Sequence, residues 1–332
     1  MTKILVIRFS SIGDIVLTSP VLRCIKQQIE GVELHMLTKK QYASMFSAHP
    51  YVDHLHLLGS DQKALIQQLK VENFDYIIDL HHNLRTARIK WALKVAAYSF
   101  PKLNIKKWLT VRLKRNVLPE QHVVERYFTT VAPLGVKNDF IGIDFFIPSE
   151  DQVDINQVYG TTRVIAFAIG AQFATKRLPR EKIVEIIQQL EEFVVLLGGE
   201  EDKETGDWIV SQLKRNNVVN SCGKLRLNQS ASVVQQASVL LTHDTGLMHI
   251  ASAFNTPIVS VWGNTVPAFG MFPYRPKKPN SFVLHEISNL SCRPCSKIGF
   301  NHCPKKHFKC MNDQNTTYIA DSAKKLAMTQ VK

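Results

Sequence analysis

Short apolar runs rich in β-branched residues alternate with longer amphipathic runs along nearly the whole chain. Strands that alternate with helices in this way indicate parallel sheets with helices on both faces. In the first half we expect strands at residues 4–9, 33–37, 54–58 and 76–80. In the second half we expect strands at residues 164–168, 193–197, 218–220, 239–242 and 258–262. The sequence therefore predicts an α/β protein with two doubly wound halves.

A polar segment without strong periodicity, residues 151–162, separates the two halves and is interpreted as a linker. Residues 1–150 then form an N-terminal domain and residues 163–315 a C-terminal domain, a division that suits a chain of 332 residues. A closing segment, 316–332, is expected to be helical, and packing of this helix on the first domain is one arrangement that the sequence allows. Ligands of such sheets bind outside the carboxyl ends of strands, so we searched the turns that follow strands.

One such turn, Asp244-Thr245-Gly246, joins an expected strand to an expected helix that contains His249. Backbone N–H groups at a helix N-terminus have no intrahelical partner, and the helix dipole attracts negative charge there. Gly246 would let a phosphate approach the main chain closely. The turn therefore predicts a site for a phosphorylated ligand; simple capping of the helix by Asp244 and Thr245 is the alternative.

The turn after the first strand contains Asp14, preceded by Ser10, Ser11 and Gly13. A dinucleotide site would need three glycines in the spacing GxGxxG here, so the single glycine disfavours a nicotinamide cofactor. A carboxylate at this place can take a proton from a substrate hydroxyl if its surroundings raise its pKa toward the working pH. The alternative is that Ser11 and Asp14 only cap the next helix.

Two further turns lie in the second half. Thr175-Lys176 precedes Pro179, and a lysine there would neutralise charge on a departing diphosphate. Gly198-Gly199 is followed by Glu200, Glu201 and Asp202, acids that can accept hydrogen bonds from ribose hydroxyls. Alternatively, these acids favour the start of the next helix through its dipole.

Taken in order, these four turns resemble those of glycosyltransferase family 9, the bacterial heptosyltransferases of lipopolysaccharide assembly, and the resemblance spans nearly the whole chain. It implies the GT-B architecture, in which two Rossmann-like domains with parallel sheets face one another across an interdomain cleft. The implied enzyme is an inverting glycosyltransferase that moves heptose from ADP-heptose to a lipid-anchored lipopolysaccharide core acceptor. No cofactor is required for that chemistry, and no metal enters the chemical step.

The resemblance also implies roles for individual residues. Asp14 would be the general base, and Lys176 would bind the diphosphate. The other donor-side positions would be Ser10, Ser11, Gly13, Thr175, Glu201, Asp202, Asp244, Thr245, Gly246 and His249, with Asp202 favoured over Glu201 as the acid near the nucleoside. The acceptor-side positions would be His82, Asn83, Arg85 and Arg88, of which Arg85 would meet a phosphate or an acidic sugar. The chain departs from the family at Leu178, where tryptophan is frequent, which leaves the exact donor open.

The net charge of +13 is concentrated in few segments. Residues 85–115 contain ten Lys and Arg and no acid, with Trp91 and Trp108 among them. Apolar side chains among cations are typical of segments that lie at an anionic membrane surface. No apolar run suits a signal peptide or a membrane span. We therefore expect a cytoplasmic protein, peripheral on the inner face of the cytoplasmic membrane; a merely solvated basic face is the alternative.

Four cysteines, Cys292, Cys295, Cys303 and Cys310, follow the spacing C-x2-C-x7-C-x6-C. Four thiolates can hold a tetrahedral zinc, but this spacing is not that of a standard finger or ribbon. A structural zinc, a disulfide formed on oxidation and free thiols all remain open.

Two other functions were considered. A basic nucleic-acid-binding protein with a Cys-rich zinc module would explain the charge but leave Asp14, Lys176 and the Asp244 turn without roles. A nucleotide-sugar epimerase or hydrolase of GT-B fold would use the same donor pocket with a different outcome. We expect the glycosyltransferase, with no nucleic acid among its partners.

Overall fold

The computed structural model describes residues 1–329, which divide into two compact units. Unit 1 comprises residues 1–103 and 121–148, and unit 2 comprises residues 104–120 together with the chain from residue 149 on. The expected boundary is thus corrected in two places. Residues 104–120 belong to unit 2, and so does the expected linker, where the backbone N–H of Val153 donates to Ser232 Oγ at 2.9 Å.

Unit 1 is built on a sheet of five strands in the order β3-β2-β1-β4-β5, with every neighbouring pair parallel. The strands are β1 (Lys3–Ile7), β2 (Glu33–Lys39), β3 (His54–Leu58), β4 (Tyr76–Asp79) and β5 (Ala96–Ser99). The helices are α1 (Ile12–Val16), α2 (Ser19–Gln28), α3 (Gln62–Val71), α4 (Leu84–Leu93) and α6 (Val123–Phe128). β1 lies in the middle and its residues from Ile4 to Ile7 are fully buried, which explains its unbroken apolar sequence.

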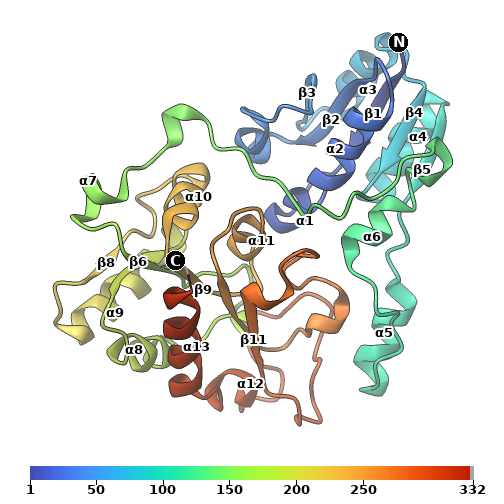
Figure 1. The fold of residues 1–332 in the computed structure, drawn as a ribbon. Coiled ribbons are helices and arrows are strands. Elements are labelled where there is room, and N and C mark those ends of the chain that lie inside the picture. The colour runs from blue at the N-terminus through green and yellow to red at the C-terminus, as the bar shows by residue number, and fades with distance from the viewer. Residues whose placement is uncertain (330–332) are drawn as a thin grey trace. The chain divides into compact units, whose positions relative to one another are not determined.

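Unit 2 is built on a sheet of six strands in the order β11-β10-β9-β6-β7-β8, again entirely parallel (Figure 1). The strands are β6 (Val164–Ala168), β7 (Phe193–Leu197), β8 (Val218–Asn220), β9 (Val239–His243), β10 (Ile258–Trp262) and β11 (Phe282–Glu286). The helices are α5 (Asn104–Leu113), α7 (Ile155–Tyr159), α8 (Arg180–Gln188), α9 (Lys203–Leu213), α10 (Leu227–Gln236), α11 (Gly246–Ser252), α12 (Lys309–Asn312) and α13 (Thr316–Met328).

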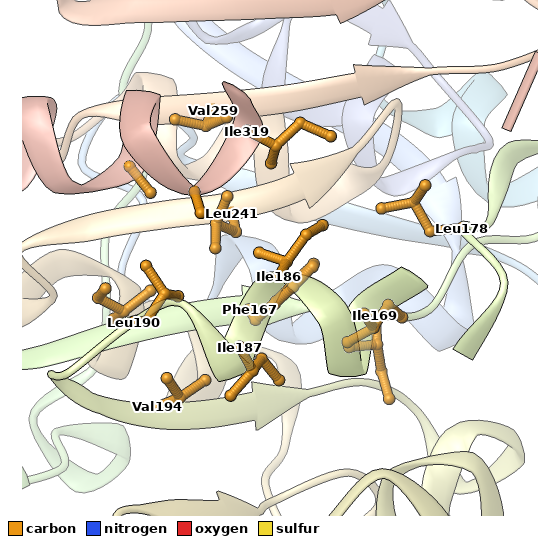
Figure 2. Close-up of a cluster of buried hydrophobic side chains, with 14 of the residues drawn as sticks. Phe167, Ile169, Leu178, Ile186, Ile187, Leu190, Val194, Leu241, Val259 and Ile319 are labelled. Atoms are coloured by element: carbon orange, nitrogen blue, oxygen red, sulfur yellow. The ribbon is translucent and has the colours of Figure 1, made fainter. Parts of the chain in front are cut away.

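The core of unit 2 forms where α8 packs on the sheet (Figure 2). Ile186 and Ile187 of α8 are fully buried against Phe167 of β6. Burial of a side chain of this size stabilises the fold by about 1.5–3 kcal/mol. Leu178, the position where the family frequently has tryptophan, is buried in this same cluster. The departure from the family pattern therefore lies in the core.

The closing helix α13 begins at the first residue of the expected segment, Thr316, and ends at Met328, but its packing partner differs from the expectation. Ile319, Ala320 and Ala323 are fully buried in the core of unit 2, where α13 packs against α8, β9 and β10. The suggested packing on the N-terminal domain is therefore wrong for this face, and residues 330–332 of that segment lie outside the described residues. None of the described helices combines the length and apolar character needed to cross a bilayer.

Candidate functional site

In unit 1 the candidate residues follow β1 and β4, which are neighbours in the sheet. Ile7 pairs with Asp79 at the carboxyl ends of the two strands. The turn from Ser10 to Asp14 and the segment from His81 to Arg85 therefore start from the same edge of the sheet, as the sequence predicted.

Asp14 lies in the first turn of α1 and is held from two sides. The hydroxyl of Ser11 donates to Asp14 Oδ2 at 2.9 Å and the backbone N–H of Ser11 donates to the same oxygen at 3.2 Å. Arg8 Nη2 lies 2.7 Å from Asp14 Oδ1. The capping role is therefore real, yet 24% of the Asp14 side chain remains exposed and accessible to a substrate.

Arg8 was not identified from the sequence, although it is the charged residue that ends the apolar run of β1. Its buried guanidinium also donates to the carbonyl of Leu80 and to the hydroxyl of Tyr127, which fixes its position. An adjacent cation favours the ionised form of a carboxylate. Arg8 thus places a buried positive charge directly beside the Asp14 carboxylate.

Buried Asp79 organises the second unit 1 segment. It accepts hydrogen bonds from the backbone N–H groups of His81 and His82 and lies 2.8 Å from Lys90 Nζ. Burial opposes ionisation, but Lys90 and these hydrogen bonds prevail and lower the pKa of Asp79. His82 is exposed, with a φ of 50°, in the left-handed region that side chains rarely adopt. For His81, burial and the charge of Arg8 lower the pKa to about 4, so this neighbour of the Asp14 turn stays neutral.

Of the other acceptor-side candidates, Asn83 caps α4 by accepting the backbone N–H of Thr86 at 3.0 Å. Arg85 and Arg88 are exposed on the first turns of that helix. Arg85 also lines a cavity of about 430 Å³ within unit 1. The other lining residues are Lys39, Lys40, Gln41, Leu58 and Gly59. Lys39 and Lys40 are distant from Arg85 in the sequence, so no local pattern connects them to it.

In unit 2 the structure brings Lys176 and Asp244 together. Lys176 follows β6, Asp244 follows β9, and these two strands are paired. Lys176 Nζ lies 2.6 Å from Asp244 Oδ2, which also accepts the hydroxyl of Thr265 at 2.9 Å. Both side chains remain partly exposed. The structure thus places this lysine beside the Asp244 turn, and their role in holding a diphosphate stays a prediction.

The backbone of this turn leads directly into α11, whose first residue is Gly246. Thr245 occupies the N-cap position, but its side chain makes no capping hydrogen bond and instead lies 3.1 Å from Thr242 Oγ1. The Asp244 carboxylate instead pairs with Lys176 and accepts the hydroxyl of Thr265. The simple capping alternative therefore does not describe these two side chains.

Two donor-side candidates are buried rather than presented to a ligand. Thr175 is held by Phe300, whose backbone N–H donates to Thr175 Oγ1 at 2.8 Å. His249 is buried within α11. A donor-side role for these two residues stays a prediction.

The acidic turn after β7 separates Glu201 from Asp202. Asp202 is buried, accepts the backbone N–H of Gly199 at 3.0 Å and lies 3.0 Å from Arg177 Nη1. Burial raises the pKa of Asp202, and Arg177 opposes that shift. A Cβ atom on Gly170 would come within 2.0 Å of the Asp202 carboxylate, so this glycine makes room for the acid. Exposed Glu201 is better placed than Asp202 to contact a ligand, opposite to the preference from sequence.

The cysteine segment contains no disulfide, since all six cysteines of the chain are free. Cys292 Sγ lies 3.7 Å from His307 Nε2, a neighbour that the sequence analysis did not single out. Burial raises the pKa of Cys295 to about 11 and that of Cys310 to about 12. Within residues 1–329, the groups of three or more metal-ligating atoms that come within 4.8 Å of one another contain no cysteine. The sulfurs as placed do not form a zinc site, and structural zinc stays a prediction.

Comparison with known proteins agrees with this geometry. The sequence model of glycosyltransferase family 9 (heptosyltransferase) matches residues 62–301. A lipopolysaccharide heptosyltransferase 1 from Pseudomonas aeruginosa is 23% identical over 339 residues, which cover 94% of this chain and 91% of the relative.

Two solved structures share the fold. A glycosyl transferase family 9 protein from Veillonella parvula superposes with a TM-score of 0.80 at 20% identity, over 99% of this chain and 98% of the other. The ADP-heptose lipopolysaccharide heptosyltransferase II of Escherichia coli gives 0.76 at 18% identity, over the full length of both chains. The expected α/β class, GT-B with two parallel sheets, is confirmed. The chain belongs to glycosyltransferase family 9 and is a glycosyltransferase.

Proposed function

We propose that this enzyme transfers heptose from ADP-heptose to a sugar of a lipid-anchored lipopolysaccharide core, with inversion at the anomeric carbon. The observation that carries the proposal is the Lys176–Asp244 pair at the start of α11, in a chain of this family. The names of its relatives support heptose as the sugar and lipopolysaccharide as the acceptor.

Unit 2 supplies the donor contacts. The ammonium of Lys176 and the backbone N–H groups that open α11 offer positive potential to the diphosphate. When phosphate oxygens bind, they compete with Asp244 for Lys176. A nucleoside diphosphate is a good leaving group, so neutralising its charge assists departure without a proton donor.

Unit 1 supplies the base. Asp14 takes the proton of the acceptor hydroxyl. At the same time the hydroxyl oxygen bonds to the anomeric carbon, and the bond from that carbon to ADP breaks. Ser11 and Arg8 hold the Asp14 carboxylate in one orientation. No step of this reaction needs a metal or a cofactor.

The acceptor is anionic, and unit 1 offers a matching surface. The cavity of about 430 Å³ is lined by three cationic side chains, Lys39, Lys40 and Arg85, and by no acid. Cations gathered around one hollow raise the local concentration of anionic ligands. We assign this cavity to a phosphate or an acidic sugar of the acceptor.

We also propose that α5 contributes to binding at the anionic cytoplasmic face of the inner membrane. Lys114 Nζ donates to the carbonyl of Pro294 at 2.7 Å, which fastens the end of the helix to unit 2. Ile105 and Trp108 on α5 are 77% and 56% exposed, and Arg112 is exposed beside them. Exposed apolar side chains among cations favour an anionic lipid surface.

Sedimentation with anionic phospholipid vesicles tests the membrane proposal. We expect binding at low salt that weakens at high salt, because screening shortens the reach of the charges. Trp108→Ser should reduce binding, whereas the control Tyr318→Ser, an exposed aromatic residue on α13, should not. Absence of binding at low salt would remove the membrane from the proposal.

The transfer itself is tested by incubation with a panel of nucleotide sugars and truncated lipopolysaccharide acceptors, followed by mass spectrometry. We expect one heptose added to the acceptor with ADP-heptose as donor. Preference for another nucleotide sugar would mean that heptose is not the sugar transferred. Product formation without an acceptor would mean that the enzyme is an epimerase or a hydrolase rather than a transferase.

A further inference from the structure

We propose that unit 1 carries a binding site for a divalent transition metal such as Zn²⁺, formed by Glu33, His35 and His54. Glu33 is the first residue of β2 and His54 is the first residue of β3, and His35 pairs with His54 across the two strands. The site therefore lies at the amino ends of these strands, away from the carboxyl ends that precede Asp14 and Arg85. It is independent of the proposed transfer reaction.

The three side chains already converge. Glu33 Oε1 lies 2.8 Å from His35 Nε2 and 3.2 Å from His54 Nε2, and all three ligand atoms lie within 4.8 Å of one another. A tetrahedral zinc with bonds of about 2.0–2.1 Å places neighbouring ligand atoms roughly 3.3 Å apart. The Glu33–His54 separation already matches this spacing, and the Glu33–His35 pair would have to open by about half an ångström.

The chemistry of the donor set suits this ion. Imidazole nitrogens and a carboxylate oxygen are ligands that zinc prefers. His35 is fully buried, and metals bind the neutral form of the imidazole ring. His54 is more than half exposed, so the ion keeps a side open to water.

A neighbouring histidine orients the buried ligand. His56 Nε2 lies 2.9 Å from His35 Nδ1, and the planes of the two rings differ by only 9°. When His35 Nε2 binds the metal, the Nδ1–H group of His35 donates to His56. Such a hydrogen bond fixes the tautomer and the ring orientation of a metal-bound histidine.

Lys3 is the competing cation. Its Nζ lies 3.3 Å from Glu33 Oε1 and 3.5 Å from Glu72 Oε2. The metal must displace Lys3 from Glu33, and Glu72 is placed to retain the lysine when that happens. Removal of the lysine charge by Lys3→Met should therefore tighten metal binding.

Cobalt titration of the full chain, with any histidine tag removed, tests the site. We expect one Co²⁺ per chain with nitrogen and oxygen ligands, seen as visible absorption without a thiolate-to-cobalt charge-transfer band. That band would report binding at the cysteine segment instead, so the same titration also tests the zinc prediction for those cysteines.

Variants separate the site from general binding. His54→Ala removes an exposed side chain and should weaken binding at least tenfold, while His56→Ala should weaken it about 10- to 100-fold. The matched control is His82→Ala, an exposed histidine of the same unit, which should bind like wild type. Melting temperatures of the metal-free variants check that each folds. Wild-type affinity in His54→Ala, or cobalt bound only through thiolates, would overturn the proposal.

Discussion

The turn after β1 in unit 1 and the turn after β9 in unit 2 each contain a glycine, a hydroxyl side chain and an acid, and they differ in what their acids hold. Asp14 lies inside the first turn of its helix, is bound by Ser11 three residues away and pairs with Arg8, which directly follows the preceding strand. Asp244 lies before its helix and pairs with Lys176, 68 residues earlier in the chain. Asp14 is thus fixed by partners close in the sequence, which suits a base that must keep one orientation. Asp244 is fixed by a distant lysine, which suits a pair that separates when a phosphate binds.

Replacement of the acid in the first turn should have the largest effect. Asp14→Asn keeps the shape of the side chain but cannot take a proton, so we expect transfer to fall about 100- to 10,000-fold. ADP affinity, measured by calorimetry, should stay near that of wild type because the donor contacts are in unit 2. Near-normal turnover would sink the assignment of Asp14 as the base.

Removal of the cation beside the second turn should reduce both binding and transfer. Lys176→Met keeps the aliphatic stem without the charge, and we expect kcat to fall about 100- to 1,000-fold. ADP should bind more weakly, which separates this variant from Asp14→Asn. Unchanged ADP affinity in Lys176→Met would mean that the lysine serves Asp244 alone.

The pH dependence of stability should include a contribution from His243, the residue before Asp244. Burial lowers the pKa of His243 to about 4, and His243 Nε2 accepts the backbone N–H of Leu178, which requires the neutral ring. Because the folded pKa lies below the unfolded value of about 6.5, this stability is complete above pH 6.5 and is lost as the pH falls toward 4. The loss amounts to up to about 3 kcal/mol.

His243→Gln removes the titration while offering an oxygen to Leu178. Denaturant unfolding between pH 7 and pH 4 should give a flatter profile for this variant than for wild type. Equal slopes for the two proteins would mean that folding does not lower the pKa of His243.

A smaller effect is expected where a glycine makes room for an acid. Gly170→Ala would place a Cβ 2.0 Å from the buried Asp202 carboxylate, and we expect a loss of about 1–3 kcal/mol in unfolding free energy. The control Gly59→Ala has no atom within 4 Å of its added Cβ and should change little. Equal melting temperatures for the two variants would show that Asp202 moves aside freely.

The smallest effect on stability is expected at Thr245, which does not cap its helix, in contrast to Asn83, which does. Thr245→Ala should change the unfolding free energy by less than about 0.5 kcal/mol, because its side chain makes no capping bond to α11. Asn83→Ala, which loses the hydrogen bond from the backbone of Thr86, should cost about 1 kcal/mol. A larger loss for Thr245→Ala would restore the simple capping role.

Most of the sheet was predictable because buried parallel strands are nearly continuous apolar runs. The two strands that the sequence did not predict, β5 and β11, both lie at the edge of a sheet, and β5 is partly exposed. None of the four residues of β5 is fully buried, so its sequence lacks the apolar run that marks the central strands. The assignment of residues 104–120 to unit 2 depends on contacts with residues far along the chain, such as Lys114 with Pro294.

The site was predictable as far as strand ends determine it. Asp14, Lys176 and Asp244 follow strands, and the family resemblance gave them roles. Arg8, His81, Lys39 and Lys40 were missed because their importance arises from tertiary neighbours. The resemblance favoured Asp202 over Glu201 as the acid near the nucleoside, and the sequence did not show that Asp202 is buried.

The most direct test of the account compares ADP release from ADP-heptose with and without a truncated lipopolysaccharide acceptor. If Asp14 activates an acceptor hydroxyl while Lys176 holds the diphosphate, each ADP released should match one heptose on the acceptor, and almost none should appear without acceptor. Equal ADP release in the absence of acceptor, with free heptose as the product, would contradict it.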